Sequence, residues 1–295
     1  MRYTIGNERL TVVADTLGAE LVKIFDKGLG QEILWQGSPA GWTGCAPILF
    51  PVVGGLKDGG YWYQGTRYDL AKHGFACESE FALEYQEAHT LRFCLRDSAL
   101  TRPHYPFPFL LYVTYDLEED TLINRCEVIN TGTLDMLFSL GYHPAFYWGE
   151  GDWLEIEGVT QAGAHRLDFN NQFLLIERKE LAPFENGRLY NREPLFRKGA
   201  WIFDDLPGAR ISLVSPRRAL HLTVSHQAPC FGLWGGPGAP FVAIEPWFGI
   251  DDLSDTGGDL EKKPMIQRLA PGACWSSAIA ISVQQQRYDD IKKEG

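Results

Sequence analysis

The sequence predicts an all-β protein built as a single large antiparallel β-sandwich with few short helices. Apolar and polar residues alternate with a period of two along much of the chain, whereas apolar residues at helical spacing are scarce. Turn-forming residues separate these segments at short intervals, and 31 glycines and 17 prolines suit a chain with many loops. Because no linker or internal repeat divides the chain, we expect one domain over residues 1–295, with sheets packed face to face.

Three segments show the alternation most clearly. The apolar faces are Leu91, Phe93 and Leu95 in the first, Phe109, Leu111, Val113, Tyr115 and Leu117 in the second, and Leu220, Leu222 and Val224 in the third. Side chains two apart lie on one face of a strand, so each set can cover a core. We expect turns at 57–60 (KDGG), 185–187 (ENG), 206–210 (LPGAR) and 235–240 (GGPGAP).

The charge of the chain excludes several classes of partner. It has 38 acidic and 27 basic residues and a formal net charge of −11, so neither nucleic acid nor an anionic membrane is expected to bind.

The first residues mix charged and apolar side chains, unlike a signal peptide, and no long uncharged apolar run occurs. Six dispersed cysteines without a CxxC pair indicate reduced thiols. We therefore expect a soluble, cytoplasmic protein.

The segment FVAIEPWFGI contains a carboxylate in an apolar run, where an unpaired charge would be costly. In strand phase Glu245 shares a face with Phe241 and Ala243. We expect Pro246 to end the strand pairing and Trp247 to place an aromatic surface beside the carboxylate. Aromatic faces next to polar groups suit a sugar, which has apolar C–H faces and a rim of hydroxyls. The alternative is an ion pair with an arginine or lysine.

Two histidines lie in sequence segments that could form a catalytic or binding site. In FSLGYHPAFYW, strand phase puts Ser139 and Gly141 on the face of His143, which leaves a concavity, and Pro144 ends the strand. His73 precedes a glycine in KHGFA, where the backbone can turn or a ligand can approach. The alternative for each histidine is a structural hydrogen bond in a packed sheet or at the surface.

Other patterns are weaker. His221 and His226 fit no compact zinc motif, and the acidic stretch DDLSDTGGDLE (Asp251, Asp252, Asp255 and Asp259) lacks the calcium-loop pattern, so we expect a solvated loop and no metal. No nucleophile elbow, phosphate loop or dinucleotide fingerprint occurs, and no cofactor is expected.

Taken together, HGFA, GYHPAF and IEPWFGI, in this order, resemble the aldose 1-epimerase (galactose mutarotase-like) family, in particular its shorter bacterial branch. LGAEL at 17–21, APILFPVVG at 46–54 and LWG at 233–235 add to the resemblance. It implies a single antiparallel β-sandwich with an open cleft across one sheet. It also implies interconversion of the α and β anomers of a hexose without a cofactor.

The resemblance also implies roles for individual residues. Glu245 resembles the family's general base, His143 its general acid, and His73 a second imidazole near the ring oxygen of the sugar. The candidates for the substrate-binding surface are Trp247, Phe75, Tyr142 and Lys57.

Two positions depart from the family pattern. Gly55 and Cys77 stand where FPxVGRL and HGFAR would each supply an arginine, whose five donors neither glycine nor a thiol replaces. Lys57 or Arg67 could substitute. Because of these departures, a non-catalytic carbohydrate-binding or sugar-sensing protein is an alternative function. A hexose-6-phosphate 1-epimerase is also an alternative, although phosphate recognition favours arginine, and a glycoside-processing enzyme would lack an assignable second carboxylate.

Overall fold

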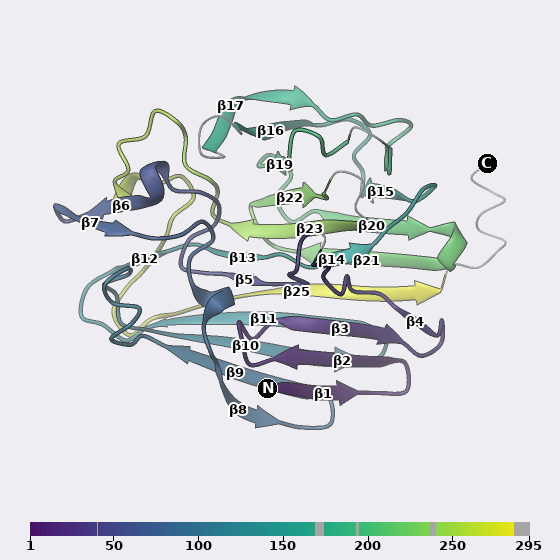
Figure 1. Cartoon of the computed structure of the whole chain (residues 1–295), viewed down its shortest axis with the longest axis horizontal. Helices are drawn as coiled ribbons and strands as arrows, with labels where there is room; N and C mark the ends of the chain where they lie inside the picture. The colour runs from purple at the N-terminus through teal and green to yellow at the C-terminus, as the bar shows by residue number, and fades with distance from the viewer. Residues whose placement is uncertain (40, 169–173, 193–194, 237–239, 286–295) are drawn as a thin grey trace.

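The structure is a computed structural model that describes residues 1–39, 41–168, 174–192, 195–236 and 240–285. Strands dominate it, and the long strands pair antiparallel (Figure 1). The helices among these residues are single 3₁₀ turns: η1 (Lys57–Gly59), η2 (Ala76–Glu78), η3 (Pro216–Arg218) and η4 (Leu260–Lys262). The predicted all-β class is confirmed. No helix in the described ranges has the length and apolar character needed to cross a membrane.

The largest sheet of the described chain has nine strands. Their spatial order is β18 (Arg188–Tyr190), β15 (Trp153–Ile156), β20 (Arg210–Ser215), β21 (Leu220–His226), β25 (Cys274–Gln285), β11 (Thr121–Asn130), β10 (Phe109–Glu118), β9 (Thr90–Arg96) and β8 (Ala82–Gln86). The three predicted strands are β9, β10 and β21, and every residue of their predicted apolar faces is buried. Strand phase therefore gave the correct inward face in each case.

The second large sheet carries the candidate site. Its order is β17 (Leu174–Leu181), β16 (Gly163–Asp168), β19 (Trp201–Phe203), β22 (Cys230–Trp234), β23 (Phe241–Phe248), β13 (Leu140–Tyr142) and β5 (Ile48–Leu49), with β14 (Ala145–Tyr147) also paired to β23. β23 is central in this sheet, since β22 lies on one side of it and β13 and β14 lie on the other.

Smaller sheets complete the fold. β1 (Arg2–Gly6), β2 (Leu10–Asp15), β3 (Leu21–Asp26) and β4 (Gln31–Glu32) form one; β6 (Gly60–Tyr63) and β7 (Thr66–Asp69) form a hairpin; β12 (Met136–Phe138) pairs with β24 (Gln267–Leu269). The ring of Tyr3 on β1 lies 6.1 Å from that of Phe93 on β9, so the first sheet packs on the nine-stranded one.

The main core lies between the two large sheets. One cluster of buried side chains draws members from most of the chain, the first being Ile5 and the last Val283. It includes Val242 and Ile244 of β23. Tyr142 of β13 is fully buried on the same side, and its hydroxyl donates to the carbonyl of Ser277 on β25 (2.9 Å). The face of β13 and β23 that carries Tyr142, Val242 and Ile244 therefore packs in the core. The opposite face is left for the site.

Pro246 corrects one expectation. β23 continues through it to Phe248, so the proline does not end the pairing. The amide of Ile244 donates to Pro144 on the side of β13 and β14, and residues two apart point their amides to the same side. Pro246 stands opposite Tyr142, the last residue of β13, so its missing amide faces the point where the pairing of β23 passes from β13 to β14.

The predicted turns fall between strands. Residues 57–59 form η1, 185–187 connect β17 to β18, and 206–210 begin between β19 and β20. In the fourth turn, residues 237–239 lie outside the described residues.

Candidate functional site

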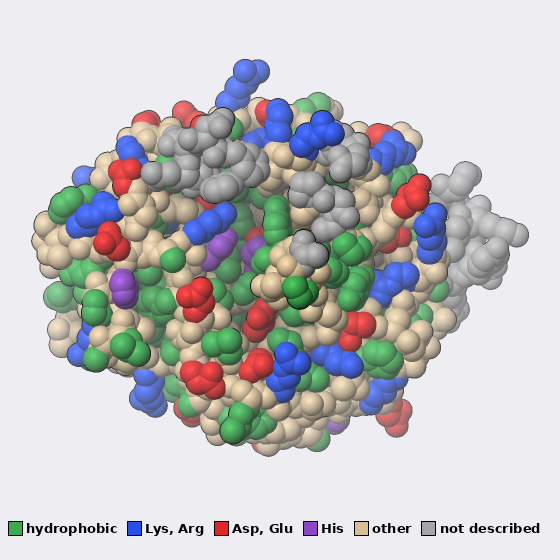
Figure 2. Space-filling view, in the orientation of Figure 1, with side chains coloured by type: hydrophobic (Ala, Val, Ile, Leu, Met, Phe, Trp, Pro, Cys, Tyr) green, Lys and Arg blue, Asp and Glu red, His purple; other side chains and the backbone are tan. Residues whose placement is uncertain are grey.

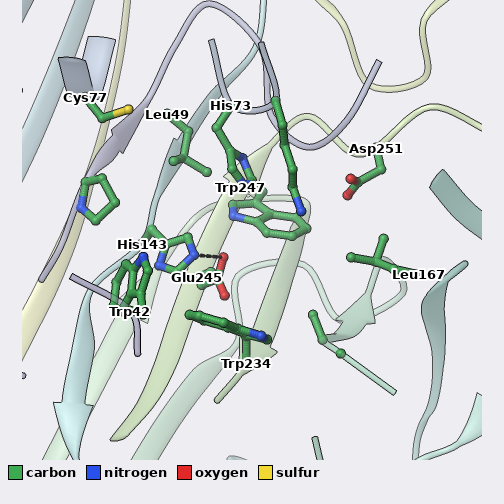
Figure 3. A pocket seen from close by; sticks show the side chains of 14 residues that line it. Trp42, Leu49, His73, Cys77, His143, Leu167, Trp234, Glu245, Trp247 and Asp251 are labelled. Atoms are coloured by element: carbon green, nitrogen blue, oxygen red, sulfur yellow. Dashed lines mark ion pairs between the residues drawn. The ribbon is translucent and has the colours of Figure 1, made fainter. Parts of the chain in front are cut away.

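Strand register brings His143 to Glu245. β13 pairs Gly141 with Trp247, and β14 pairs Ala145 with Ala243. Two residues inward from either pair, His143 stands opposite Glu245 on the same face of the sheet. Their side chains meet, with Nε2 of the histidine 3.0 Å from Oε2 of the carboxyl group (Figure 3).

A cavity of about 430 Å³ opens over this face of β23. This volume lies in the usual range for small-molecule sites. In the space-filling view, histidine side chains are visible in a hollow over β13 and β23 (Figure 2). The described residues that line the cavity are Trp42, Pro47, Leu49, Lys72, His73, Cys77, His143, Leu167, Gly199, Ala200, Trp234, Glu245, Trp247 and Asp251.

Glycines on the neighbouring strands make room for Trp247. A Cβ atom at Gly141 would lie 2.8 Å from the indole of Trp247, and one at Gly232 would lie 3.1 Å from it. Gly232 is also the partner of Glu245 on β22, so no side chain covers the carboxyl group from that strand. The space beside Gly141, which the sequence predicted as a concavity, is thus occupied by the indole of Trp247. The cavity lies beyond that indole.

Two further indoles pack against the imidazole of His143. The ring centroids of Trp42 and Trp234 lie 5.0 Å and 5.8 Å from that of the imidazole, and the two indoles meet edge to face at 5.4 Å. Trp234 belongs to the LWG segment and pairs with Ala243, so its strand phase could have placed it here. Trp42 lies outside the strands, and no pattern in the sequence pointed to it.

His73 enters the cavity from the loop after β7. Its backbone has φ 67°, in the left-handed region, and two hydrogen bonds to Gly54 hold it: its amide donates to the Gly54 carbonyl (3.0 Å), and the Gly54 amide donates to its Nδ1 (3.1 Å). Because Nδ1 accepts, Nε2 carries the proton of the neutral ring and is a donor. The ring lies 6.1 Å from that of His143.

The glycine that follows His73 is required by close packing. Gly74 has φ 76°, and a Cβ atom there would lie 2.3 Å from the carbonyl oxygen of Phe50. The HG pair in the KHGFA segment therefore fixes where the imidazole enters the cavity.

Burial dominates the electrostatics of the pair. Glu245 is 2% exposed and His143 is 8% exposed. Burial raises the pKa of Glu245 to about 8, with the Lys72 ammonium opposing the rise and the Asp251 carboxylate adding to it. Burial lowers the pKa of His143 to about 3. At neutral pH the pair therefore shares one proton and is uncharged overall as a neutral acid and a neutral imidazole.

Burial also lowers the pKa of His73 well below its ordinary value, and the positive charge of Lys72 adds to this effect. His73 is therefore neutral at physiological pH. A neutral ring with its proton on Nε2 can donate a hydrogen bond to a ligand in the cavity without carrying charge there.

The acidic loop after β23 corrects another expectation. Asp251 and Asp252 are 1% and 2% exposed, so the prediction of a solvated loop is wrong for both. Asp252 pairs with the buried Lys263 (2.7 Å), and Asp251 accepts from the amide of Gly55 (2.7 Å). In the described part of the chain no three His, Cys, Asp or Glu side chains are grouped as a metal would need.

Three of the predicted binding residues do not line the cavity. Tyr142 follows the opposite strand phase to His143 and is buried in the core. Phe75 packs on the rings of Phe50, Tyr105 and Phe109. The ammonium group of Lys57 donates to the carbonyl of Thr256 (2.9 Å). Phe75 and Tyr142 share the segments of His73 and His143, but neighbours along a strand or loop point to different sides. Lys57 was expected to replace an absent arginine.

The two departures from the family pattern lie close to the cavity. Cys77 lines it, and burial, helped by Glu78 and Glu20, raises the pKa of its thiol to about 11, so it is neutral. Gly55 contributes its amide to Asp251. Arg67 does not compensate, since its guanidinium binds the Asp58 carbonyl (2.6 Å) and Asp69 (3.2 Å).

Comparisons with known proteins identify the family of the chain. Residues 1–282 match the family described as aldose 1-epimerase. The chain is 31% identical to the plasmid-encoded protein LacX of Lactococcus lactis subsp. lactis over 286 residues, which is 92% of this chain and 95% of that protein.

Two solved structures from lactobacilli have the same fold. A galactose mutarotase related enzyme of Lactobacillus acidophilus is 30% identical with a TM-score of 0.90, covering 98% of this chain and 99% of its own. A galactose mutarotase-like protein of Lactobacillus casei is 27% identical with a TM-score of 0.89, covering 96% and 100%. The chain therefore belongs to the aldose 1-epimerase family.

Proposed function

We propose that this protein interconverts the α and β anomers of a free hexose or a related sugar by general acid and base ring opening. The observation that carries the proposal is the contact between His143 and Glu245, 3.0 Å apart on the floor of an aromatic cavity. An acid and a base that act on one anomeric centre must be neighbours, because the anomeric hydroxyl O1 and the ring oxygen O5 are both bonded to C1.

The reaction uses both members of the pair. Glu245 takes the proton of the O1 hydroxyl while His143 gives a proton to O5, so the C1–O5 bond breaks and an open-chain aldehyde forms. Rotation about C1–C2 presents the other face of the carbonyl group. O5 then attacks C1, its proton returns to His143, and Glu245 returns a proton to O1.

Because His143 and Glu245 share one proton, the reaction cycle needs no proton from solvent. Burial favours the uncharged arrangement of the pair, with the proton on Glu245. Transfer of that proton to His143 produces the carboxylate base and the imidazolium acid together, and no proton has to enter from solvent. The Nε2–H of His73 supports the change by offering a hydrogen bond to an oxygen near C1.

The aromatic walls suit the substrate class. Trp42, Trp234 and Trp247 offer flat apolar surfaces to the C–H faces of a sugar ring. Lys72 is the one lysine or arginine among the described lining residues, which favours an uncharged sugar over a hexose 6-phosphate. The six free cysteines support a reducing compartment such as the cytoplasm.

The proposal is tested by following freshly dissolved α-glucose, α-galactose, pentoses and hexose 6-phosphates toward anomeric equilibrium with polarimetry or NMR. We expect faster equilibration than in buffer, with a preference for a free sugar in direct competition with its phosphate. Gly55 and Cys77 favour the second candidate, a non-catalytic sugar-binding protein. Sugar binding by calorimetry without any acceleration would support that candidate and contradict the enzyme.

A further inference from the structure

Asp251 is a buried acidic side chain in the cavity that the proposed reaction does not use. It is 1% exposed and lines the same cavity as Glu245. Figure 3 shows it on the far side of Trp247 from His143. Its position therefore suits contact with a part of the ligand away from the reacting carbon.

Only one of the two carboxyl oxygens of Asp251 has a hydrogen-bond partner among the described residues. Oδ1 accepts from the Gly55 amide (2.7 Å), whereas Oδ2 is buried and has no hydrogen-bond partner among the described residues. A buried acceptor without a partner is destabilising, so native structures rarely keep one without a reason. A ligand hydroxyl in the cavity would satisfy Oδ2.

The backbone next to Asp251 fixes the direction of its carboxyl group. Gly54 has φ 75°, and a Cβ atom there would lie 2.3 Å from the carboxyl carbon. Only a glycine lets residues 54 and 55 pass this close, so the backbone clamps the carboxyl group. The group is thus fixed before any ligand binds, which reduces the entropy lost on binding.

Lys72 supplies a positive charge to the same space. It precedes His73 and lines the cavity. Its ammonium group acts on Asp251, Glu245 and His143 together, which places it within electrostatic reach of all three. An ammonium group has three donors, which complement a carboxyl acceptor when both contact hydroxyls.

We propose that Asp251 and Lys72 form the substrate-orienting subsite of this protein, in which Oδ2 of Asp251 accepts from one hydroxyl of a neutral sugar and Lys72 donates to another. The pair stands in for the arginines absent at Gly55 and Cys77. This inference rests on the proposed function and adds a substrate class to it: an uncharged aldose with free hydroxyls away from C1. A phosphate group would find a single ammonium, that of Lys72, whose charge the Asp251 carboxylate already offsets.

Direct binding separates this inference from the proposed reaction. In the Glu245→Gln protein, titrations of glucose and galactose followed by NMR measure affinity without turnover. We expect Asp251→Asn, which keeps the acceptor for the Gly55 amide, and Lys72→Met each to weaken binding about 10- to 100-fold, as for a hydrogen bond to a charged group. Lys23→Met is the matched control, because Lys23 lies on β3 and pairs with Glu32 (3.8 Å), and it should bind as the parent does.

Deoxy sugars supply a readout that a structural role would not move. The protein with Asp251 should bind at least one monodeoxyglucose, with the hydroxyl at C2, C3, C4 or C6 removed, about 10-fold or more weaker than glucose. Asp251→Asn should bind that deoxy sugar and glucose with similar affinity. In the protein with Glu245 intact, Asp251→Asn should raise KM more than it lowers kcat.

Three results would overturn the subsite. One is an unchanged preference for glucose over every deoxy sugar in both Asp251→Asn and Lys72→Met. Another is equal affinity loss in Lys23→Met, and the third is no binding of any sugar by the Glu245→Gln protein. A wild-type protein that binds sugars but does not speed mutarotation would contradict the proposed reaction alone, because the binding titrations do not depend on turnover.

Discussion

The pH dependence of the proposed reaction follows from the shared proton of His143 and Glu245. The pair needs one proton to supply an acid and a base at once. Burial raises the pKa of Glu245 to about 8 and lowers that of His143 to about 3, so the pair holds one proton between these two values. Above pH 8 the last proton leaves and no acid remains; below pH 3 both groups are protonated and no base remains.

The predicted profile of kcat/KM is therefore flat from about pH 5 to 7 and falls about tenfold per pH unit above 8, reaching about a tenth of its plateau at pH 9. An ordinary histidine acid beside an ordinary carboxylate base would already lose activity above about pH 6.5. The assay is polarimetry of freshly dissolved α-galactose, with the spontaneous rate in the same buffer subtracted at each pH.

Two results would contradict a proton shared between His143 and Glu245. A decline in kcat/KM centred near pH 6.5 would mean that burial does not retain the shared proton. A rate that rises through pH 8 would mean that the ionised carboxylate alone limits the reaction and that the proton on the pair is not used.

Three further predictions test the packing and charges around the pair. Lys72→Met should move the alkaline limb of the profile to higher pH, since the ammonium lowers the pKa of Glu245; a limb at lower pH would contradict this. Gly141→Ala should destabilise the fold by about 1–3 kcal/mol in urea unfolding and raise KM, because its Cβ atom would lie 2.8 Å from Trp247; Gly163→Ala, with its nearest contact at 3.5 Å, is the control and should lose much less. Asp252→Ala should cost about 3–5 kcal/mol by leaving Lys263 as a buried unpaired charge, and a loss below about 1 kcal/mol would show that the ammonium finds another partner.

Strand phase was the part of the sequence that could be read most reliably. It put Glu245 on the face opposite Val242 and Ile244, and it put His143 on the side opposite Tyr142; in the structure Val242, Ile244 and Tyr142 are in the core. Glu245 lies on β23 and His143 directly follows β13, so a period of two was enough to find their faces. Their meeting needed the register of β13 and β14 against β23, which one sequence does not specify.

Residues in loops could not be placed in this way. Lys72, Trp42 and Asp251 lie outside the strands and reach the cavity through long-range contacts such as the hydrogen bond of Gly55 to Asp251. The charge of Asp251 suggested solvent, yet the close approach of Gly54 buries it. Phe75 belongs to a motif segment, yet its ring packs against the core cluster and away from the cavity.

In the proposed reaction Glu245 acts on the anomeric hydroxyl as the base. The most direct measurement is the rate at which Glu245→Gln brings α-galactose to anomeric equilibrium, compared with the wild-type protein at pH 7 and with buffer. We predict a loss of about 10²- to 10⁴-fold in the enzymatic rate with an unchanged circular dichroism spectrum. A Glu245→Gln protein that keeps the wild-type rate would contradict the role of Glu245 as the base.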